Sequence, residues 1–149
     1  MAIYTKISRN DIISIDRKFN LGKIISFKGI KKGIENTNYL IRTKNNKYIL
    51  TIFEKRVQKK DLPFFMSLMN KLNNHKINCP KPQKSKKGNY LVNIKNKSAS
   101  IVSFVEGKDK LKLNPKNCYE IGKNIAKLHR ASKKIKLYRK NSLSLKEWP

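Results

Sequence analysis

The first part of the chain carries apolar residues at helical spacing. Ile12, Ile15 and Phe19 recur three or four residues apart, which is the period that places side chains on one face of a helix. Ser8 precedes them, with an acidic residue three positions further on, as in a capping box. The sequence therefore predicts a short helix from about Ser8 to Phe19.

Two groups of segments are rich in β-forming residues and have the length of strands. Residues 21–28, 39–43 and 48–53 form the first group. Two asparagines join the last two of these segments, and Asn tolerates the positive φ of a tight turn. Residues 90–94 and 98–107 form the second group. The pattern predicts three consecutive strands and, later in the chain, a pair.

Two more helices are predicted, one between the strand groups and one after them. The first begins at Asp61, a residue type suited to an N-cap, has Pro63 in its first turn and ends near Asn74. The second begins at Asn114 and carries an apolar stripe. The stripe consists of Ile121, Ile125 and Leu128. The whole order predicts an α+β fold in which a five-stranded antiparallel sheet has one helix packed on its face.

The formal charge of +27 first suggests a nucleic-acid partner. Lysine outnumbers arginine by 30 to 6, however, and the lysines are spread along the whole chain. Arginine is the better fork for phosphates and base edges. Lys, Asn and Ile supply 65 of the 149 residues, and all three have A/T-rich codons. Base composition therefore explains the charge, and we expect only weak, non-specific binding to nucleic acids.

The same sequence favours a cytoplasmic protein. No run approaches the roughly 20 apolar residues of a membrane span, and the start MAIYTKISRND has no apolar signal-peptide region. Cys79 and Cys118 form no C-x-x-C pattern. We therefore expect free thiols in a reducing compartment, with a disulfide between the two as the less favoured interpretation.

The stretch SFKGIKKGIENTNYLI, residues 26–41, places two glycines four apart and then Asn-x-Asn between two predicted strands. One interpretation is a hairpin with a loose tip in which Asn forms the turn. The other is a backbone flap that closes over a phosphate chain, because glycine allows close approach and unusual φ. The stretch alone favours the first interpretation.

Seven stretches, in order along the chain, resemble the aminoglycoside-phosphotransferase and choline-kinase branch of the protein-kinase-like fold. They are SFKGIKKGIENTNYLI, YILTIFEKR, DLPFFMSLMNKL, CPKP, IVSFVEGK, IGKNIAKLH and NSLSLKEW. Within that branch they are most similar to the bacterial homoserine kinases of the phosphotransferase type. The resemblance implies a kinase-like, ATP-binding N-terminal lobe over residues 1–107. Residues 108–149 would then hold the exit from the hinge, a helix and the start of a C-terminal lobe.

With this resemblance the phosphate flap becomes the favoured interpretation of residues 26–41. Gly29 and Gly33 would let the backbone approach the phosphates of ATP. Asn36 and Asn38 would either fix the flap by bonding backbone groups or donate an amide N–H to a phosphate oxygen.

The third strand of such kinases carries a basic residue that holds the α- and β-phosphates. By the resemblance that place falls on Thr51, which is a departure from the family pattern. Lys55 or Arg56, at the end of the strand, is the expected substitute. The alternative, that both belong to a solvated strand terminus, is equally compatible with the sequence.

The resemblance places the interlobe hinge after the fifth strand. There the backbone of Ser103, Phe104 and Val105 would present N–H and C=O groups to the adenine edge. Apolar side chains would wall the adenine, although an ordinary role in the core is an alternative for them. These side chains are Ile25, Ile52 and Ile101.

The resemblance covers only the first half of such kinases, whose catalytic Asp and metal-binding Asp lie in the C-terminal lobe. The sequence contains no H-x-D-x-x-x-x-N pattern, and neither His75 nor His129 has a partner at metal-ligand spacing. We therefore expect no catalytic and no metal-binding residue in this chain, and Mg²⁺ ligands in the missing lobe. The chain would be a fragment, a truncated gene product or a single lobe without kinase turnover of its own.

The implied reaction transfers the γ-phosphoryl group of ATP to L-homoserine, on the route to threonine. One alternative is a kinase of choline or another small alcohol. Another is a non-enzymatic basic protein that binds RNA or DNA. Apolar surface meant for a second lobe also predicts marginal stability or self-association.

Overall fold

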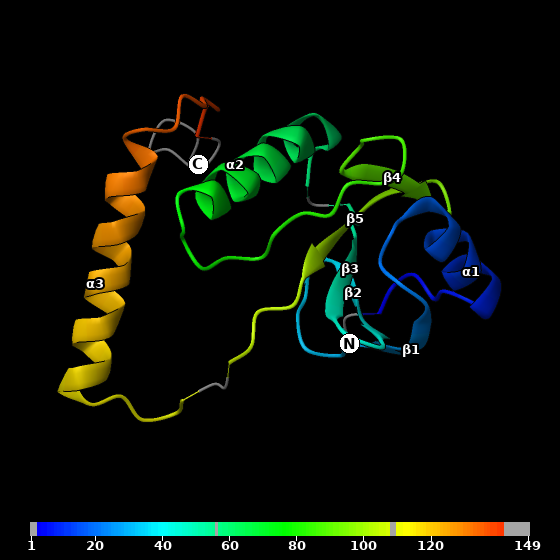
Figure 1. Cartoon of the computed structure of the whole chain (residues 1–149), viewed down its shortest axis with the longest axis horizontal. Helices are drawn as coiled ribbons and strands as arrows, with labels where there is room; N and C mark the ends of the chain where they lie inside the picture. Colours follow the sequence, from blue (N-terminus) through cyan, green and yellow to red (C-terminus); the bar gives the residue numbers. More distant parts are fainter. Residues whose placement is uncertain (1–2, 56, 108–109, 142–149) are drawn as a thin grey trace.

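The computed structural model describes residues 3–55, 57–107 and 110–141. It confirms the predicted α+β fold with a five-stranded antiparallel sheet (Figure 1). The elements of the described residues are α1 (Arg9–Lys18), β1 (Ile24–Gly29), β2 (Thr37–Thr43), β3 (Lys47–Ile52), the short 3-10 helix η1 (Lys59–Asp61), α2 (Leu62–Asn74), β4 (Leu91–Ile94), β5 (Lys97–Ser103) and α3 (Pro115–Ser132).

The strands lie in the order β1-β2-β3-β5-β4. The asparagine pair does join β2 to β3, closed by a hydrogen bond of 2.9 Å from the Thr43 N–H to the Asn46 carbonyl. The positive φ expected for this turn is wrong. It occurs instead in the hairpin between β4 and β5, at Lys95 (49°) and Asn96 (60°).

The main core lies between one face of the sheet and α1. Alternate residues of β2 and β3 enter it, as Ile41 and Leu50 do, because side chains of a strand point to opposite faces in turn. Ile12 and Ile15 of α1 cover them. The predicted capping box starts this helix, since the Ser8 side chain accepts a hydrogen bond of 3.2 Å from the Asp11 N–H.

Helix α2 lies on the other side of the sheet, next to β4 and β5 (Figure 1). Leu62 and Met66 are buried residues of α2, and they do not belong to the α1 core. Asp61 stands at the N-cap position, yet its side chain makes no capping hydrogen bond. Its carboxylate is instead 3.0 Å from the guanidinium of Arg139. The expected cap is therefore replaced by a long-range ion pair.

Helix α3 stands apart from the sheet (Figure 1). The predicted N-cap is confirmed, because the Asn114 side chain accepts a hydrogen bond of 2.9 Å from the Asn117 N–H. The apolar stripe is exposed, with 47% of Ile121, 48% of Ile125 and 38% of Leu128 accessible to solvent. The described residues therefore leave this stripe largely uncovered, and the predicted surface for a second lobe stays a prediction.

Cys79 and Cys118 are both free thiols, and burial raises the pKa of Cys79 above its ordinary value. Within the described residues, no helix is both long enough and apolar enough to cross a membrane.

Candidate functional site

The face of β1, β2 and β3 opposite α1 is only partly covered, and we call it the open face. Antiparallel register places directly paired residues on the same side of the sheet. Leu40 pairs with Ile49 and Asn38 pairs with Thr51, and all four are half-buried. Their neighbours in sequence lie in the α1 core. The open face thus offers apolar and hydroxyl or amide side chains to a ligand that packs against the sheet.

The glycine segment forms a flap between β1 and β2, spanning Ile30 to Asn36. A hydrogen bond of 2.8 Å from the Ile30 N–H to the Asn38 carbonyl continues the ladder to its base. Gly33 has a φ of +119°, which a side chain would make strained. The unusual φ predicted for this glycine is confirmed. The flap therefore requires glycine at its centre.

Gly29 has a different reason to be glycine. A Cβ atom at this position would collide with the Cδ1 atom of Ile3. Gly29 pairs with Tyr39, which belongs to the α1 core, so this close approach occurs on the side away from the open face. The close approach at Gly29 is therefore to Ile3 of this chain, and the predicted approach to phosphates stays a prediction.

Asn36 and Asn38 fix the base of the flap. The Oδ1 atom of Asn36 accepts a hydrogen bond of 3.2 Å from the Glu54 N–H. The Oδ1 atom of Asn38 accepts one of 2.8 Å from the Thr51 hydroxyl, and its Nδ2 atom is 3.5 Å from the Asn36 carbonyl. Each amide thus bonds a backbone group at the base of the flap, which is the first of the two expected roles. Thr51, where the kinase pattern would have a basic residue, lies on the open face together with Asn38.

The expected substitutes for a basic residue at Thr51 lie past the end of β3. Lys55 is exposed at a bend, and Arg56 lies outside the described residues. Register identifies a third basic residue that the sequence analysis missed. Lys28 pairs with Leu40, so it lies on the open face, one residue before the end of β1, and it is exposed. Strand pairing, which a single sequence does not reveal, is the signal that finds it.

The sequence analysis also missed Glu54. Its carboxylate bonds to three side chains near the flap. Its side chain is 9% exposed and ion-paired to Lys97. The hydroxyls of Thr5 and Thr37 each donate to its carboxylate at 2.7 Å. Burial alone would raise the pKa of Glu54, but the hydrogen bonds from Lys97, Thr37 and Thr5 outweigh it, so the pKa lies below its ordinary value. The signal was present, because strand alternation puts position 54 on the same side as Leu50.

The expected hinge uses most of its N–H groups internally. The Ser103 N–H donates to the Lys81 carbonyl at 2.9 Å, and the Phe104 N–H donates to the Lys47 carbonyl at 3.0 Å. Neither can also donate a full hydrogen bond to adenine, which corrects the expectation for these two donors. Val105 makes no such backbone bond among the described residues, so its N–H stays a candidate.

The adenine wall expected from Ile52 and Ile101 is wrong. Both side chains are 0% exposed and lie in the α1 core, so they face away from the open side. Ile25 is 67% exposed, at the bulge where β1 shifts register against β2. Leu40 and Ile49 are instead the apolar side chains on the open face.

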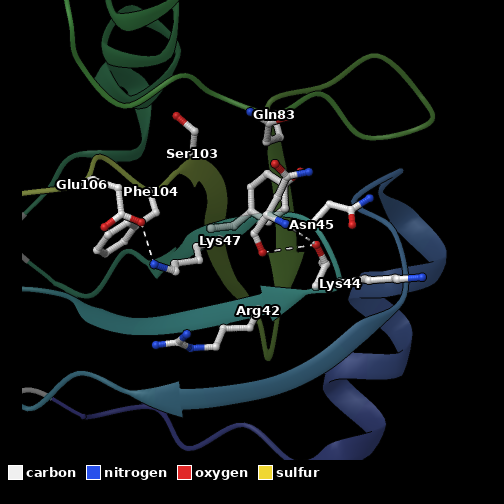
Figure 2. A pocket seen from close by; sticks show the side chains of 11 residues that line it. Arg42, Lys44, Asn45, Lys47, Gln83, Ser103, Phe104 and Glu106 are labelled. Atoms are coloured by element: carbon white, nitrogen blue, oxygen red, sulfur yellow. Dashed lines mark hydrogen bonds and ion pairs between the residues drawn. The ribbon is translucent and has the colours of Figure 1, made fainter.

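A hollow of about 560 Å³ opens where the turn between β2 and β3 meets the hinge. Figure 2 shows Lys47 reaching toward Glu106 beside Phe104, while Lys44 points away. The Nζ atom of Lys47 is 2.6 Å from the Glu106 carboxylate and 5.4 Å from the centre of the Phe104 ring. Arg42 adds another positive charge to the lining. The hollow is therefore polar and cationic, and one of its cations is already paired.

Metal chemistry has no evident centre in this part of the chain. The described residues contain no group of three or more His, Cys, Asp and Glu side chains placed to hold an ion. His75 is the C-cap of α2, and His129 lies in the last turn of α3, where a basic residue suits the helix dipole.

Comparisons with known proteins agree with the fold and add its relatives. Residues 26–149 match the model of the phosphotransferase enzyme family. The chain is 39% identical over 148 residues to a homoserine kinase of Parvibaculum lavamentivorans and 38% identical to that of Bradyrhizobium diazoefficiens. The alignments cover 99% of this chain but 46% and 45% of the relatives. The chain therefore spans about half the length of the curated relatives it matches.

The solved structures include a spectinomycin phosphotransferase in complex with ADP and spectinomycin. It superposes with a TM-score of 0.66 over 85% of this chain and 39% of that chain, at 13% sequence identity. The AMP-bound complex of the same enzyme gives a TM-score of 0.61 at 14% identity. At this level of identity the likeness establishes the fold alone.

Proposed function

Because the chain belongs to the phosphotransferase enzyme family, we propose that it is the ATP-binding part of a homoserine kinase. The reaction transfers the γ-phosphoryl group of ATP to the side-chain hydroxyl of L-homoserine. The observation that carries the proposal is the 39% identity, over 148 residues, to a homoserine kinase. The open face supports it, because it joins an apolar surface to a glycine flap. Residues 1–107 would form the nucleotide lobe, and 108–149 would lead out of it.

The open face suits an adenine ring that packs on Leu40 and Ile49. Small-molecule sites bury most of their ligand against apolar side chains and orient it with a few polar groups. The Val105 N–H, just past the end of β5, is the candidate for the adenine edge. The N–H groups of Ser103 and Phe104 would then hold the hinge in place through their bonds to Lys81 and Lys47, and their carbonyl groups would stay candidates for the adenine edge.

The triphosphate would extend from there beneath the flap. Backbone N–H groups around Gly33 would point at phosphate oxygens, and the glycine would keep side chains out of the way. Mg²⁺ would neutralise charge on the β- and γ-phosphates when bound. The described residues provide no cluster to hold it, so the proposal assigns the metal ligands and the catalytic base to the half of the relatives that this chain does not match.

Nucleotide binding by the purified 149-residue chain tests the proposal. We expect NMR titrations at physiological salt to show saturable binding of ATP. Adenosine should displace the bound ATP, but only at higher concentration. L-Homoserine with Mg²⁺ and ATP should give no phosphohomoserine. Because the chain carries a charge of +27, inorganic tripolyphosphate is the necessary control. Competition by tripolyphosphate equal to that of ATP, with none by adenosine, would indicate non-specific anion binding and contradict the proposed site. Phosphorylation of homoserine by the chain alone would refute the assigned division of labour.

Lys28 and Lys55 can be compared as phosphate contacts. We expect Lys28→Ala to weaken ATP binding about fivefold, the size of one exposed charge-assisted hydrogen bond, because Lys28 lies on the open face beside the flap. Lys55→Ala should change it less than twofold. Adenosine binding should be the same in both variants and the parent chain. Equal losses in the two variants would show that total charge, and not the position of Lys28, determines the affinity.

A further inference from the structure

The segment from Ile3 to Ile7 runs across the sheet on the α1 side. The hydroxyl of Tyr39 donates to the Thr5 carbonyl at 3.0 Å and accepts from the Ile7 N–H at 3.2 Å. Ile3 and Ile7 pack against the α1 core, and Thr5 is buried. The segment is therefore anchored on the α1 core.

The same segment contacts the flap at both of its stems and near its tip. Ile3 meets the first stem at Gly29, where no Cβ atom fits. The N–H groups of Tyr4 and Thr5 donate to the hydroxyl oxygen of Thr37, the first residue after the flap, at 2.9 and 3.1 Å. The Tyr4 hydroxyl donates to the carbonyl of Ile34, within the flap, at 2.8 Å.

Glu54 ties these contacts to the end of β3. Its carboxylate accepts from the hydroxyls of Thr5 and Thr37, one from each side of the contact. Its N–H donates to the Asn36 side chain in the last position of the flap. The segment, the second stem of the flap and the end of β3 thus form one hydrogen-bonded unit.

We infer that residues 3–5 are a brace that holds the glycine flap from the side opposite the open face, and that Tyr4 is a positioning residue for the phosphates beneath it. A glycine-containing flap is intrinsically mobile, since glycine has more backbone freedom to lose than any other residue. Holding its Ile34 carbonyl from outside orders it before a ligand arrives. A pre-ordered flap loses less conformational entropy on binding. The part of the inference that concerns phosphates rests on the proposed function, whereas the brace itself does not.

The geometry separates Tyr4 from an ordinary packing residue. Its side chain is 57% exposed, so its ring contributes little to the core, and its hydroxyl bonds to the flap alone among the described residues. A role in stability would fall on Thr5 and Ile3, which are anchored below it.

Tyr4→Phe removes the hydroxyl and keeps the ring, and Tyr138→Phe is the matched control because Tyr138 is 89% exposed. We expect Tyr4→Phe to raise hydrogen exchange of the flap amides, Lys31 to Glu35, about three- to fivefold without ligand, the loss of one modest hydrogen bond. ATP should bind about three- to fivefold more weakly. Adenosine affinity should not change, the midpoint of urea unfolding should fall by no more than the loss of that one hydrogen bond, and Tyr138→Phe should alter none of these.

Unchanged flap exchange in Tyr4→Phe would overturn the brace, whether or not the chain binds nucleotides. Equal weakening of ATP and adenosine would assign Tyr4 a merely structural role and also overturn the inference. Faster flap exchange together with no binding of ATP or adenosine to the parent chain would support the brace and contradict the proposed function. The two failures are therefore distinguishable.

Discussion

Replacing Glu54 by glutamine is expected to lower the free energy of unfolding at pH 7 by about 2–3 kcal/mol. The carboxylate receives hydrogen bonds from two threonine hydroxyls and from Lys97. Both threonine hydroxyls donate to the Oε1 atom and Lys97 to the Oε2 atom, so a glutamine that keeps its carbonyl oxygen toward the hydroxyls turns its NH₂ group toward Lys97. Lys97 is 40% exposed, so water screens its charge. Most of the loss comes from the two buried hydroxyls, whose charge-assisted hydrogen bonds to the carboxylate become weaker bonds to a neutral oxygen. Urea unfolding followed by circular dichroism measures the difference.

The same variant should flatten the dependence of stability on pH. The pKa of Glu54 is lower in the folded chain than its ordinary value of 4.5. When the pH falls below that value, the unfolded chain takes up a proton before the folded chain does, so stability decreases toward acid pH. The contribution is complete above about pH 5 and is lost as the pH falls through the folded pKa. Asp11 also has a lowered pKa, mainly because the Ser8 N–H donates to it, so some pH dependence should remain in the variant.

Glu106→Gln is the control for the loss of one negative charge. Glu106 is 72% exposed and pairs with Lys47, and exposed pairs contribute about 0–1 kcal/mol. We expect a change below about 0.5 kcal/mol and an unaltered pH profile. If both variants lost the same stability, the effect of Glu54 would come from the net charge of a very basic chain. The hydrogen bonds of Glu54 with Thr5, Thr37 and Lys97 would then not stabilise the fold.

The fold was predictable because its information is local and periodic. Alternating burial along β2 follows the sequence pattern, with Tyr39 and Ile41 buried and Arg42 exposed. The caps of α1 and α3 are short sequence motifs and form as predicted. Such signals need no knowledge of distant residues, because they arise from the repeat of the strand and from the unpaired N–H groups at the start of a helix.

The candidate site was less predictable because it depends on which strands pair and on which face of the sheet is left open. Alternation shows that Ile52 and Thr51 face opposite ways, but it does not say which side α1 covers. The wall was therefore assigned to Ile52 and Ile101, which are in the core. The hinge donors of Ser103 and Phe104 are taken by Lys81 and Lys47, partners more than 20 residues away in sequence. Lys28 became a candidate only through its register with Leu40.

Replacing Thr51 by lysine should tighten ATP binding about tenfold. The resemblance to kinases places a phosphate-anchoring base at this position, and the structure places Thr51 on the open face, paired with Asn38 at the base of the flap. A hydrogen bond to a charged group is worth about 1.5–3 kcal/mol, and part of it is offset because the Thr51 hydroxyl no longer donates to Asn38. Adenosine, which has no phosphate, should bind as before. Titration of both ligands by NMR measures the difference.

Two controls isolate the position of the new charge. Thr51→Val removes the same hydroxyl without adding a cation, and it should change ATP affinity less than twofold. Asn10→Lys adds one positive charge to an exposed position of α1, on the far side of the sheet, and should leave ATP affinity unchanged. Equal tightening in Asn10→Lys and Thr51→Lys would mean that ATP responds to total charge, and the phosphates would not lie beside Thr51. In the Lys28→Ala background, Thr51→Lys should recover the lost affinity, because two lysines flanking β2 beneath the flap can each contact the same triphosphate.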